Sequence, residues 1–225
     1  MDISQNITQT WSEKEELFPG LWVYRNVIKP ELDIINRIED AATKNQIRAG
    51  WAEAMVGKME KHPEYRDCLD FKLNKLDFAD GDPRAKHPDA IKFNKIWHDC
   101  YDAQIGSVDD YCKKYNIEMK YWEASNFVKY SSNQHFQEHA DHGWSYICTV
   151  SLVAYPNDDY EGGELTFPKL GVKVKPRAGD LYIFPSTFLF SHRAEKITSG
   201  TKYSIVTMLD YNDKAHTEAF HNEKY

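Results

Sequence analysis

The stretch His135-Phe136-Gln137-Glu138-His139-Ala140-Asp141 decides the fold prediction, because a strand and a helix would present its side chains differently. In a strand, residues two apart point to the same face, so His139 and Asp141 would share one cavity. In a helix, residues four apart share a face, which would bring His135 and His139 together instead. Ser131-Ser132-Asn133 precedes the stretch, and these residues favour a turn over a helix interior. We therefore predict a strand that delivers an imidazole and a carboxylate into one cavity.

A third ligand would complete a metal site around His139 and Asp141. One more histidine from a distant strand gives two histidines and one carboxylate, the ligand set of non-haem Fe(II) oxygenases. This set leaves coordination positions open on one side for substrate chemistry. His192, which follows the apolar run Phe188-Leu189-Phe190, is the candidate for that third ligand.

An alternative metal chemistry starts from the same stretch. Residues 135–139 also fit HxxEH, the inverted signature of zinc metallopeptidases, in which both histidines lie on one helical face. This alternative requires a helix at 135–139, whereas the strand-like flanks and the nearby Gly143 oppose one. A catalytically silent jelly-roll binding module is the second alternative.

The sequence after residue 120 is typical of a β-rich fold. Short apolar or alternating segments recur there and are separated by turn signals such as Gly162-Gly163 and Ser199-Gly200. The strand-like segments are 126–130, 146–155, 164–167, 172–175, 181–184 and 203–209. Evenly spaced short strands with Gly and Pro between them predict a sandwich or barrel.

The first 120 residues are predicted to be mainly helical. After a short strand at 21–24, Pro30 opens a helix whose apolar residues recur at helical spacing. A second helical stretch covers 88–115, and Gly106 indicates that it is two helices. Residues 50–87, rich in Lys, Asp, Gly and Pro, show no sustained period and are predicted to be irregular, with a possible role as a lid.

The composition is typical of globular proteins and argues against nucleic acid and membranes as partners. Of its 225 residues, 41% are hydrophobic and 28% are charged, and the net charge is −7. An acidic chain without a basic patch does not favour binding to nucleic acid. No apolar run reaches the roughly 18 residues of a membrane span, so no membrane contact is expected. Four cysteines without a CxxC pair predict reduced thiols and a cytoplasmic location.

Residues 126–211 together resemble the 2-oxoglutarate/Fe(II)-dependent oxygenase superfamily, specifically its prolyl 4-hydroxylase-like branch. The resemblance covers about two-fifths of the chain and lies in the order and spacing of several segments. These are 126–130 (NFVKY), Gln134, 139–141 (HAD), 150–155 (VSLVAY), 161–168 (EGGELTFP), 174–184 (VKPRAGDLYIF), Ser191-His192 and 200–204 (GTKYS). The implied fold is α+β: a double-stranded β-helix (jelly-roll) core in the C-terminal half, with N-terminal helices packed on one sheet. We expect one domain over 1–225, with helical support and a possible lid in 1–120 and the jelly-roll core in 121–211.

The resemblance also implies a role for each matching residue. His139, Asp141 and His192 match the iron ligands. Lys202 matches the basic residue that pairs with the far carboxylate of 2-oxoglutarate, and Tyr130 matches the tyrosine that hydrogen-bonds the same carboxylate. The remaining co-substrate positions are Ser204, which follows the family's basic-x-Ser pattern, and Thr149.

The implied reaction is hydroxylation of a C–H bond, with 2-oxoglutarate and O2 as co-substrates and succinate and CO2 as products. Ascorbate is the implied reductant, and the implied partner is a peptide or protein substrate, with peptidyl proline as the candidate target. Family members that act on peptides often have an aromatic residue directly after HxD, whereas His142-Gly143-Trp144 follows it here. Candidate substrate contacts are Trp144, Tyr146 and Arg177, while Trp51 and Arg66 are placed at the border of the entrance. His142 is expected to face solvent.

Overall fold

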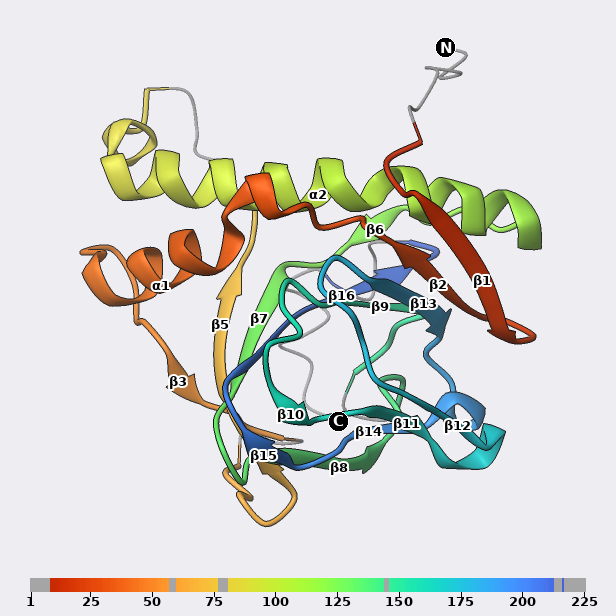
Figure 1. Ribbon diagram of the computed structural model, residues 1–225. Helices are drawn as coiled ribbons and strands as arrows, with labels where there is room; N and C mark the ends of the chain where they lie inside the picture. Colours follow the sequence, from red (N-terminus) through yellow and green to blue (C-terminus); the bar gives the residue numbers. More distant parts are fainter. Residues whose placement is uncertain (1–8, 57–59, 77–80, 144–145, 213–215, 217–225) are drawn as a thin grey trace.

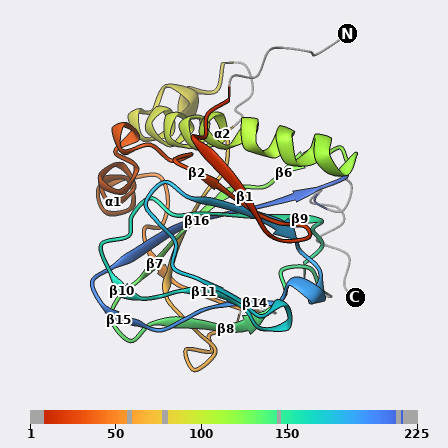
Figure 2. The same cartoon turned by 45° about the vertical axis from the view of Figure 1, so that its right-hand side comes forward.

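The computed structural model describes residues 9–56, 60–76, 81–143, 146–212 and 216. These residues form two facing β-sheets, with two α-helices against the outer face of the larger sheet (Figures 1 and 2). This arrangement confirms the predicted α+β class and its double-stranded β-helix core.

The larger sheet has nine strands and combines segments from both halves of the chain. In spatial order they are β1 (Glu13–Phe18), β2 (Leu21–Arg25), β13 (Leu181–Pro185), β9 (Val150–Ala154), β16 (Lys202–Asp210), β7 (Ser125–Tyr130), β5 (Leu69–Leu73) and β3 (Ala52–Glu53), with β6 (Tyr121–Trp122) paired to β16. All pairings between these strands are antiparallel.

The smaller sheet faces the inner side of the larger one. Its order is β12 (Val172–Val174), β11 (Leu165–Phe167), β14 (His192–Ala194), β8 (His135–His139) and β4 (Arg66–Asp67). A separate pair joins β10 (Glu161–Gly162) to β15 (Ile197–Ser199). Short 3-10 turns are η1 (Pro30–Leu32), η2 (Pro83–Lys86), η3 (Pro168–Leu170) and η4 (Phe188–Phe190).

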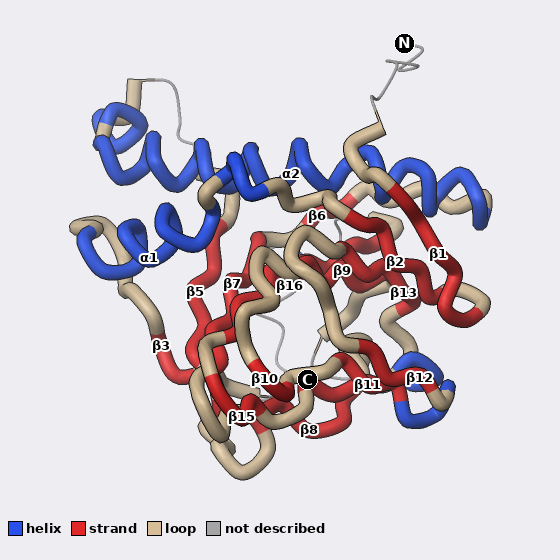
Figure 3. Tube along the Cα trace, in the orientation of Figure 1, coloured by secondary structure: helices blue, strands red, loops and turns tan. Residues whose placement is uncertain are grey.

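The helices α1 (Ile34–Lys44) and α2 (Pro88–Tyr115) lie side by side on one face of the larger sheet (Figure 3). The main apolar core joins the two layers: Ile38 and Phe93 from the helices pack in one cluster with Ile205 and Leu209 of β16. Because side chains alternate along a strand, Lys202, Ser204, Val206 and Met208 face the smaller sheet instead. The polar start of β16 is therefore directed into the space between the sheets.

The prediction that Gly106 divides the second helix in two is wrong. α2 runs without a break from Pro88 to Tyr115, and its buried stripe continues through Cys100, Ser107 and Tyr111. A glycine inside a helix costs about 1 kcal/mol relative to alanine. Burial of a stripe along the whole helix outweighs that cost.

The prediction that residues 50–87 are irregular is wrong for strands β3, β4 and β5, which belong to the two sheets. β5 pairs with β7 in the larger sheet, and β4 pairs with β8 in the smaller one. Leu69, Phe71 and Leu73 alternate with charged residues, which is a strand pattern, but the segment's high charge obscured it. At the other edge, β1 carries four charged residues, as exposed edge strands often do.

The predicted strand at 146–155 is confirmed over Val150–Ala154 alone. In the described part of the chain, neither helix combines the length and the apolar character needed to cross a membrane.

Candidate metal centre

Three side chains from two neighbouring strands converge at one rim of the barrel. His139 is the last residue of β8 and His192 the first of β14, and the two are direct partners in the antiparallel pairing. Asp141 lies two residues beyond the end of β8. Potential ligand atoms of the three residues all lie within 4.8 Å of one another. Nε2 of His139 is 3.6 Å from Asp141 Oδ1, and Nε2 of His192 is 3.9 Å from Asp141 Oδ2.

Both imidazoles are oriented by backbone carbonyl oxygens. Nδ1 of His139 is 2.9 Å from the carbonyl oxygen of Gln137, and Nδ1 of His192 is 3.1 Å from that of Phe190. A carbonyl oxygen accepts a hydrogen bond, so it favours the tautomer in which Nδ1 carries the proton. Each Nε2 then keeps its lone pair for the shared space, as metal-binding histidines require.

The charge state of the cluster fits a divalent cation. Burial alone raises the pKa of Asp141, but the charge of His192 and hydrogen bonds from His139 and Ser151 outweigh it and hold that pKa well below its ordinary value. Burial lowers the pKa of His192 to about 4, against the opposing effect of the Asp141 carboxylate. At neutral pH the donor set is therefore a carboxylate with a neutral imidazole at His192, a combination suited to Fe(II).

Two serines that the sequence analysis did not single out support the carboxylate. Ser151 Oγ donates to Asp141 Oδ2 at 2.6 Å and lies 2.7 Å from Ser186 Oγ. Both serines are buried. A hydroxyl within the apolar strand 150–154 was the available signal, because a buried polar group needs a partner.

Lys202 occupies the interior of the same barrel. It pairs with Tyr130 across β16 and β7, and its side chain is 1% exposed. Its ammonium donates to the carbonyl oxygen of Gly163 at 2.7 Å and lies 5.3 Å from the Tyr130 ring and 5.1 Å from the Tyr155 ring. Burial lowers the pKa of Lys202 to about 7. No carboxylate in the described ranges lies within ion-pair distance of this ammonium.

Gly163 has a function that the sequence analysis did not assign to it. Its φ is +66°, which disfavours a residue with a side chain, and a Cβ there would lie 2.3 Å from Ile197 Cδ1 and 3.2 Å from Lys202 Cδ. The glycine therefore allows the lysine stem to pass close to the backbone that accepts its hydrogen bond.

Two of the other predicted co-substrate residues lie next to Lys202 in the larger sheet. Tyr130 is its strand partner, and Ser204 lies on the same face of β16. Thr149 is placed elsewhere: its hydroxyl donates to Asp210 Oδ1 at 2.6 Å, at the opposite end of β16.

The predicted substrate contacts are dispersed. Trp144 lies outside the described residues. Tyr146 precedes β9, with its ring 5.7 Å from that of His216. Arg177 is exposed in the turn before β13, whereas Ser186, which is linked to Asp141 through Ser151, follows the other end of that strand. His142 is exposed, and its Nδ1 lies 2.7 Å from the Cys148 carbonyl oxygen.

The two residues predicted to border the entrance lie at different sheets. Trp51 packs on Phe71 and Tyr203, on the helix side of the larger sheet. Arg66 lies on β4 next to strand β8, with its guanidinium over the Phe136 ring.

The zinc peptidase alternative is not favoured, because residues His135–His139 form strand β8 and not a helix. Nε2 of His135 lies 3.2 Å from the Glu64 carbonyl oxygen, while Glu138 accepts hydrogen bonds from Lys169 and Ser191. The two histidines of HxxEH therefore have different surroundings.

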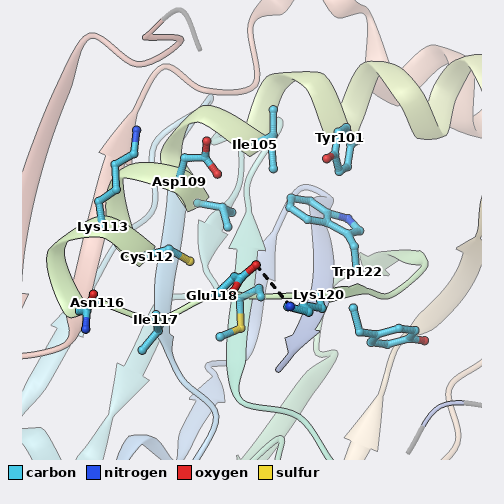
Figure 4. A pocket seen from close by; sticks show the side chains of 13 residues that line it. Tyr101, Ile105, Asp109, Cys112, Lys113, Asn116, Ile117, Glu118, Lys120 and Trp122 are labelled. Carbon is cyan, nitrogen blue, oxygen red and sulfur yellow. Dashed lines mark ion pairs between the residues drawn. The ribbon is translucent and has the colours of Figure 1, made fainter. Parts of the chain in front are cut away.

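A cavity of about 430 Å³ lies away from this centre, between α2 and the segment that leads into β6 (Figure 4). Ile105 and Trp122 line it, and at its rim Glu118 pairs with Lys120. None of the three candidate metal ligands borders this cavity.

Comparison with known proteins finds similarity over the part of the chain that contains this cluster. Residues 125–209 match the sequence model of the 2OG-Fe(II) oxygenase superfamily. A PKHD-type hydroxylase of Colwellia psychrerythraea is 42% identical over 65 residues, which is 28% of this chain and 27% of that protein. The chain spans less than half the length of the curated relatives it matches.

Two solved structures share the fold. A prolyl hydroxylase from Trichoplax adhaerens, in complex with a hypoxia inducible factor peptide fragment, superposes with a TM-score of 0.64 at 15% identity, over 85% of this chain and 84% of that one. The viral collagen prolyl hydroxylase of Paramecium Bursaria Chlorella virus-1, as its 2-oxoglutarate complex, gives 0.52 at 18% identity, over 84% and 95%. The sequence match covers residues 125–209, the part of the chain that contains the three clustered side chains, and there the chain is similar to the 2OG-Fe(II) oxygenase superfamily and to its prolyl 4-hydroxylase-like members.

Proposed function

We propose that the chain is an Fe(II)- and 2-oxoglutarate-dependent dioxygenase that hydroxylates a C–H bond and releases succinate and CO2. One observation carries the proposal: the cluster of His139, Asp141 and His192 shares a barrel with a buried lysine that has no carboxylate partner in the described part of the chain. A metal at one point and a cation at another are what a dicarboxylate keto acid needs.

The residues divide the work as follows. His139 and His192 would hold Fe(II) through Nε2, and Asp141 through a carboxylate oxygen that Ser151 keeps in place. With 2-oxoglutarate and O2, bound Fe(II) supplies the oxidising chemistry, in which decarboxylation of the keto acid accompanies insertion of one oxygen atom into a C–H bond.

The co-substrate contacts come from β16 and β7. Lys202 would bind the far carboxylate of 2-oxoglutarate, with Tyr130 as a phenol donor and Ser204 as a hydroxyl on the same face. Burial raises the pKa of Tyr130 well above its ordinary value, so this phenol keeps its proton and can donate it to a carboxylate. Thr149 remains a weaker co-substrate candidate because its hydroxyl is already bonded to Asp210.

The substrate proposed is a peptide or protein, with proline as the target of 4-hydroxylation. The similarity to prolyl hydroxylases, one of them bound to a peptide, supports this choice. Trp144, Tyr146 and Arg177 stay the proposed substrate contacts, and ascorbate the proposed reductant. We further propose one oxygenase domain over 1–225 and a cytoplasmic location, since strands from both halves share the sheets and the four cysteines are free thiols.

Release of succinate tests this function. The full chain, supplied with Fe(II), ascorbate, air and 2-oxoglutarate, is expected to produce succinate, and the yield should rise with a proline-containing peptide that gains one oxygen atom by mass. The His139→Ala variant, which keeps the apolar core but loses a ligand, is expected to produce none above background. Full succinate release by that variant would remove the assigned centre, and no release by the wild-type chain would favour the silent jelly-roll module.

A further inference from the structure

The two candidate histidine ligands are supported unequally. The side chain of His192 is 8% exposed and packs against the rings of Phe184 and Phe167, at 4.9 and 5.5 Å. The side chain of His139 is 15% exposed and lies at the end of its strand. In the described part of the chain, the His139 ring contacts two other rings, those of His192 and Phe136. The Phe136 ring is stacked on it at 3.6 Å with an interplanar angle of 14°. The plane of the His139 imidazole therefore depends on Phe136.

The Phe136 ring is in turn covered by a cation. Arg66 lies opposite Phe136 in the pairing of β4 with β8, and its guanidinium carbon is 4.8 Å from the ring centroid. The Phe136 ring therefore contacts both the His139 imidazole and the Arg66 guanidinium. Arg66, Phe136 and His139 thus form a continuous stack that ends at the candidate metal centre.

The outer layer of this stack is fixed in place. Nη2 of Arg66 donates to Asp70 Oδ1 at 2.8 Å and Nη1 donates to the Met55 carbonyl oxygen at 2.9 Å. Its Nε is buried and has no hydrogen-bond partner among the described residues, and the guanidinium is oriented by these two contacts and by the Phe136 ring. Such a planar group packs on an aromatic face in a way that a lysine ammonium does not.

The segment before Arg66 holds the strand that carries the stack. The Tyr65 ring meets the Phe136 ring edge-on at 5.7 Å, and its hydroxyl donates to the Glu138 carbonyl oxygen at 2.9 Å. The Gln137 amide donates to the Tyr65 carbonyl oxygen at 2.8 Å. The backbone carbonyl oxygen of the same residue, Gln137, orients Nδ1 of His139.

We propose that Arg66 is a positioning residue for the metal ligand His139 and that it acts through Phe136. This inference rests on the proposed function, since it assumes that His139 binds a metal. The hydrogen bond to Gln137 sets the direction of Nε2 within the imidazole plane, and the stack sets the plane itself. The hydrogen bond and the stack together fix the orientation of the His139 imidazole at the rim of the barrel. Without them, metal binding would have to restrict the motion of this side chain, at a cost in affinity.

Affinity for Mn(II), a redox-stable substitute for Fe(II), tests the proposal without turnover. Supporting residues around metal ligands typically contribute 10- to 100-fold in affinity, so Phe136→Leu is expected to weaken Mn(II) binding by about tenfold. Phe136→Tyr keeps the ring and is expected to stay within about twofold of wild type. Arg66→Met should weaken binding several-fold. His139→Ala defines the background uptake at other acidic sites.

The double variant separates an action through Phe136 from an independent one. If Arg66 acts through the ring, Arg66→Met adds no further loss in a Phe136→Leu background. The matched control is Arg193→Met: Arg193 follows the other histidine ligand, but it pairs with Glu195 and contacts no ring in the described part of the chain. This control is expected to bind Mn(II) like wild type.

The outcomes are distinct. Unchanged affinity in Phe136→Leu, equal loss in Phe136→Tyr, or a full additional loss in the double variant overturns the proposal while leaving the proposed function intact. Wild-type uptake no greater than that of His139→Ala overturns both. Melting temperatures of the metal-free variants identify any that fail to fold. If Arg66→Met is one of them, Arg66→Lys replaces it, because lysine keeps the positive charge beside Asp70 but lacks the planar guanidinium. Arg66→Lys should therefore lose Mn(II) affinity in the same way.

Discussion

Lys202 is a single residue whose buried charge favours binding of an anionic ligand. A buried ammonium costs free energy unless an anion or several acceptors compensate it. The described chain offers Lys202 one carbonyl acceptor and a set of tyrosine rings, and burial keeps its pKa near 7. The folded protein therefore carries a destabilising charge that a bound dicarboxylate would neutralise.

Replacing this charge should separate stability from function. Lys202→Met is expected to unfold at a higher temperature than wild type near pH 7 without ligand, and to lose the stabilisation that 2-oxoglutarate gives the wild-type chain. The folded pKa, about 7, lies below the ordinary value of 10.5, so between these values the unfolded wild-type chain binds more protons and wild-type stability rises with pH. The advantage of the variant should thus shrink toward pH 10. A variant less stable than wild type at pH 7, measured by thermal unfolding, would contradict this account.

The same pKa predicts how 2-oxoglutarate binding depends on pH. Only the protonated lysine pairs with the carboxylate, and its fraction falls about tenfold per pH unit well above 7. The Kd for 2-oxoglutarate, measured by calorimetry in the presence of Mn(II), should therefore increase from pH 7 to pH 9. Lys202→Arg is the control, because a guanidinium stays charged over this range and should remove the slope. A wild-type Kd that is constant between pH 7 and 9 contradicts the role of Lys202.

At the scale of elements, the strands with a strong apolar or alternating pattern were predictable and the others were not. Residues 181–184 and 203–209 carry such a pattern and form β13 and the greater part of β16. β4 has two residues, Arg66 and Asp67, and no pattern can exist over so short a length. Its place beside β8 depends on pairing across more than 60 residues of chain, which local sequence does not encode.

Strand β5 offers a test of whether residues 50–87 belong to the sheet. Leu73 is fully buried in the main core, so Leu73→Ala is expected to lower the free energy of unfolding by about 2–5 kcal/mol. Denaturant unfolding measures this directly. The matched control is Lys72→Ala at the adjacent, half-exposed position, where a change below about 1 kcal/mol is expected because the ion pair with Glu123 is at the surface. An equally small effect of Leu73→Ala would fit a detached lid rather than a sheet strand.

At the scale of the whole molecule, the helices cover one face of the larger sheet and the smaller sheet faces the other (Figure 2). The cluster of candidate metal ligands could be predicted because His139 and Asp141 are close in sequence and His192 belongs to a recognisable series of segments. Ser151 and Phe136 could not be assigned roles in the same way, since their contacts arise from the packing of strands and of an aromatic stack. The residues that support the cluster thus follow from the tertiary structure, while the candidate ligands follow from the sequence.

His139, Asp141 and His192 are proposed to bind Fe(II) together with 2-oxoglutarate. Anaerobic titration of the full chain with Fe(II) and 2-oxoglutarate, followed in the visible spectrum, tests it most directly, because the chelated keto acid gives a weak charge-transfer band. We expect the band to appear in the wild-type chain, to be absent in His139→Ala, and to decay with formation of succinate when air is admitted. Absence of the band in the wild-type chain, together with tight binding of zinc, would contradict the account.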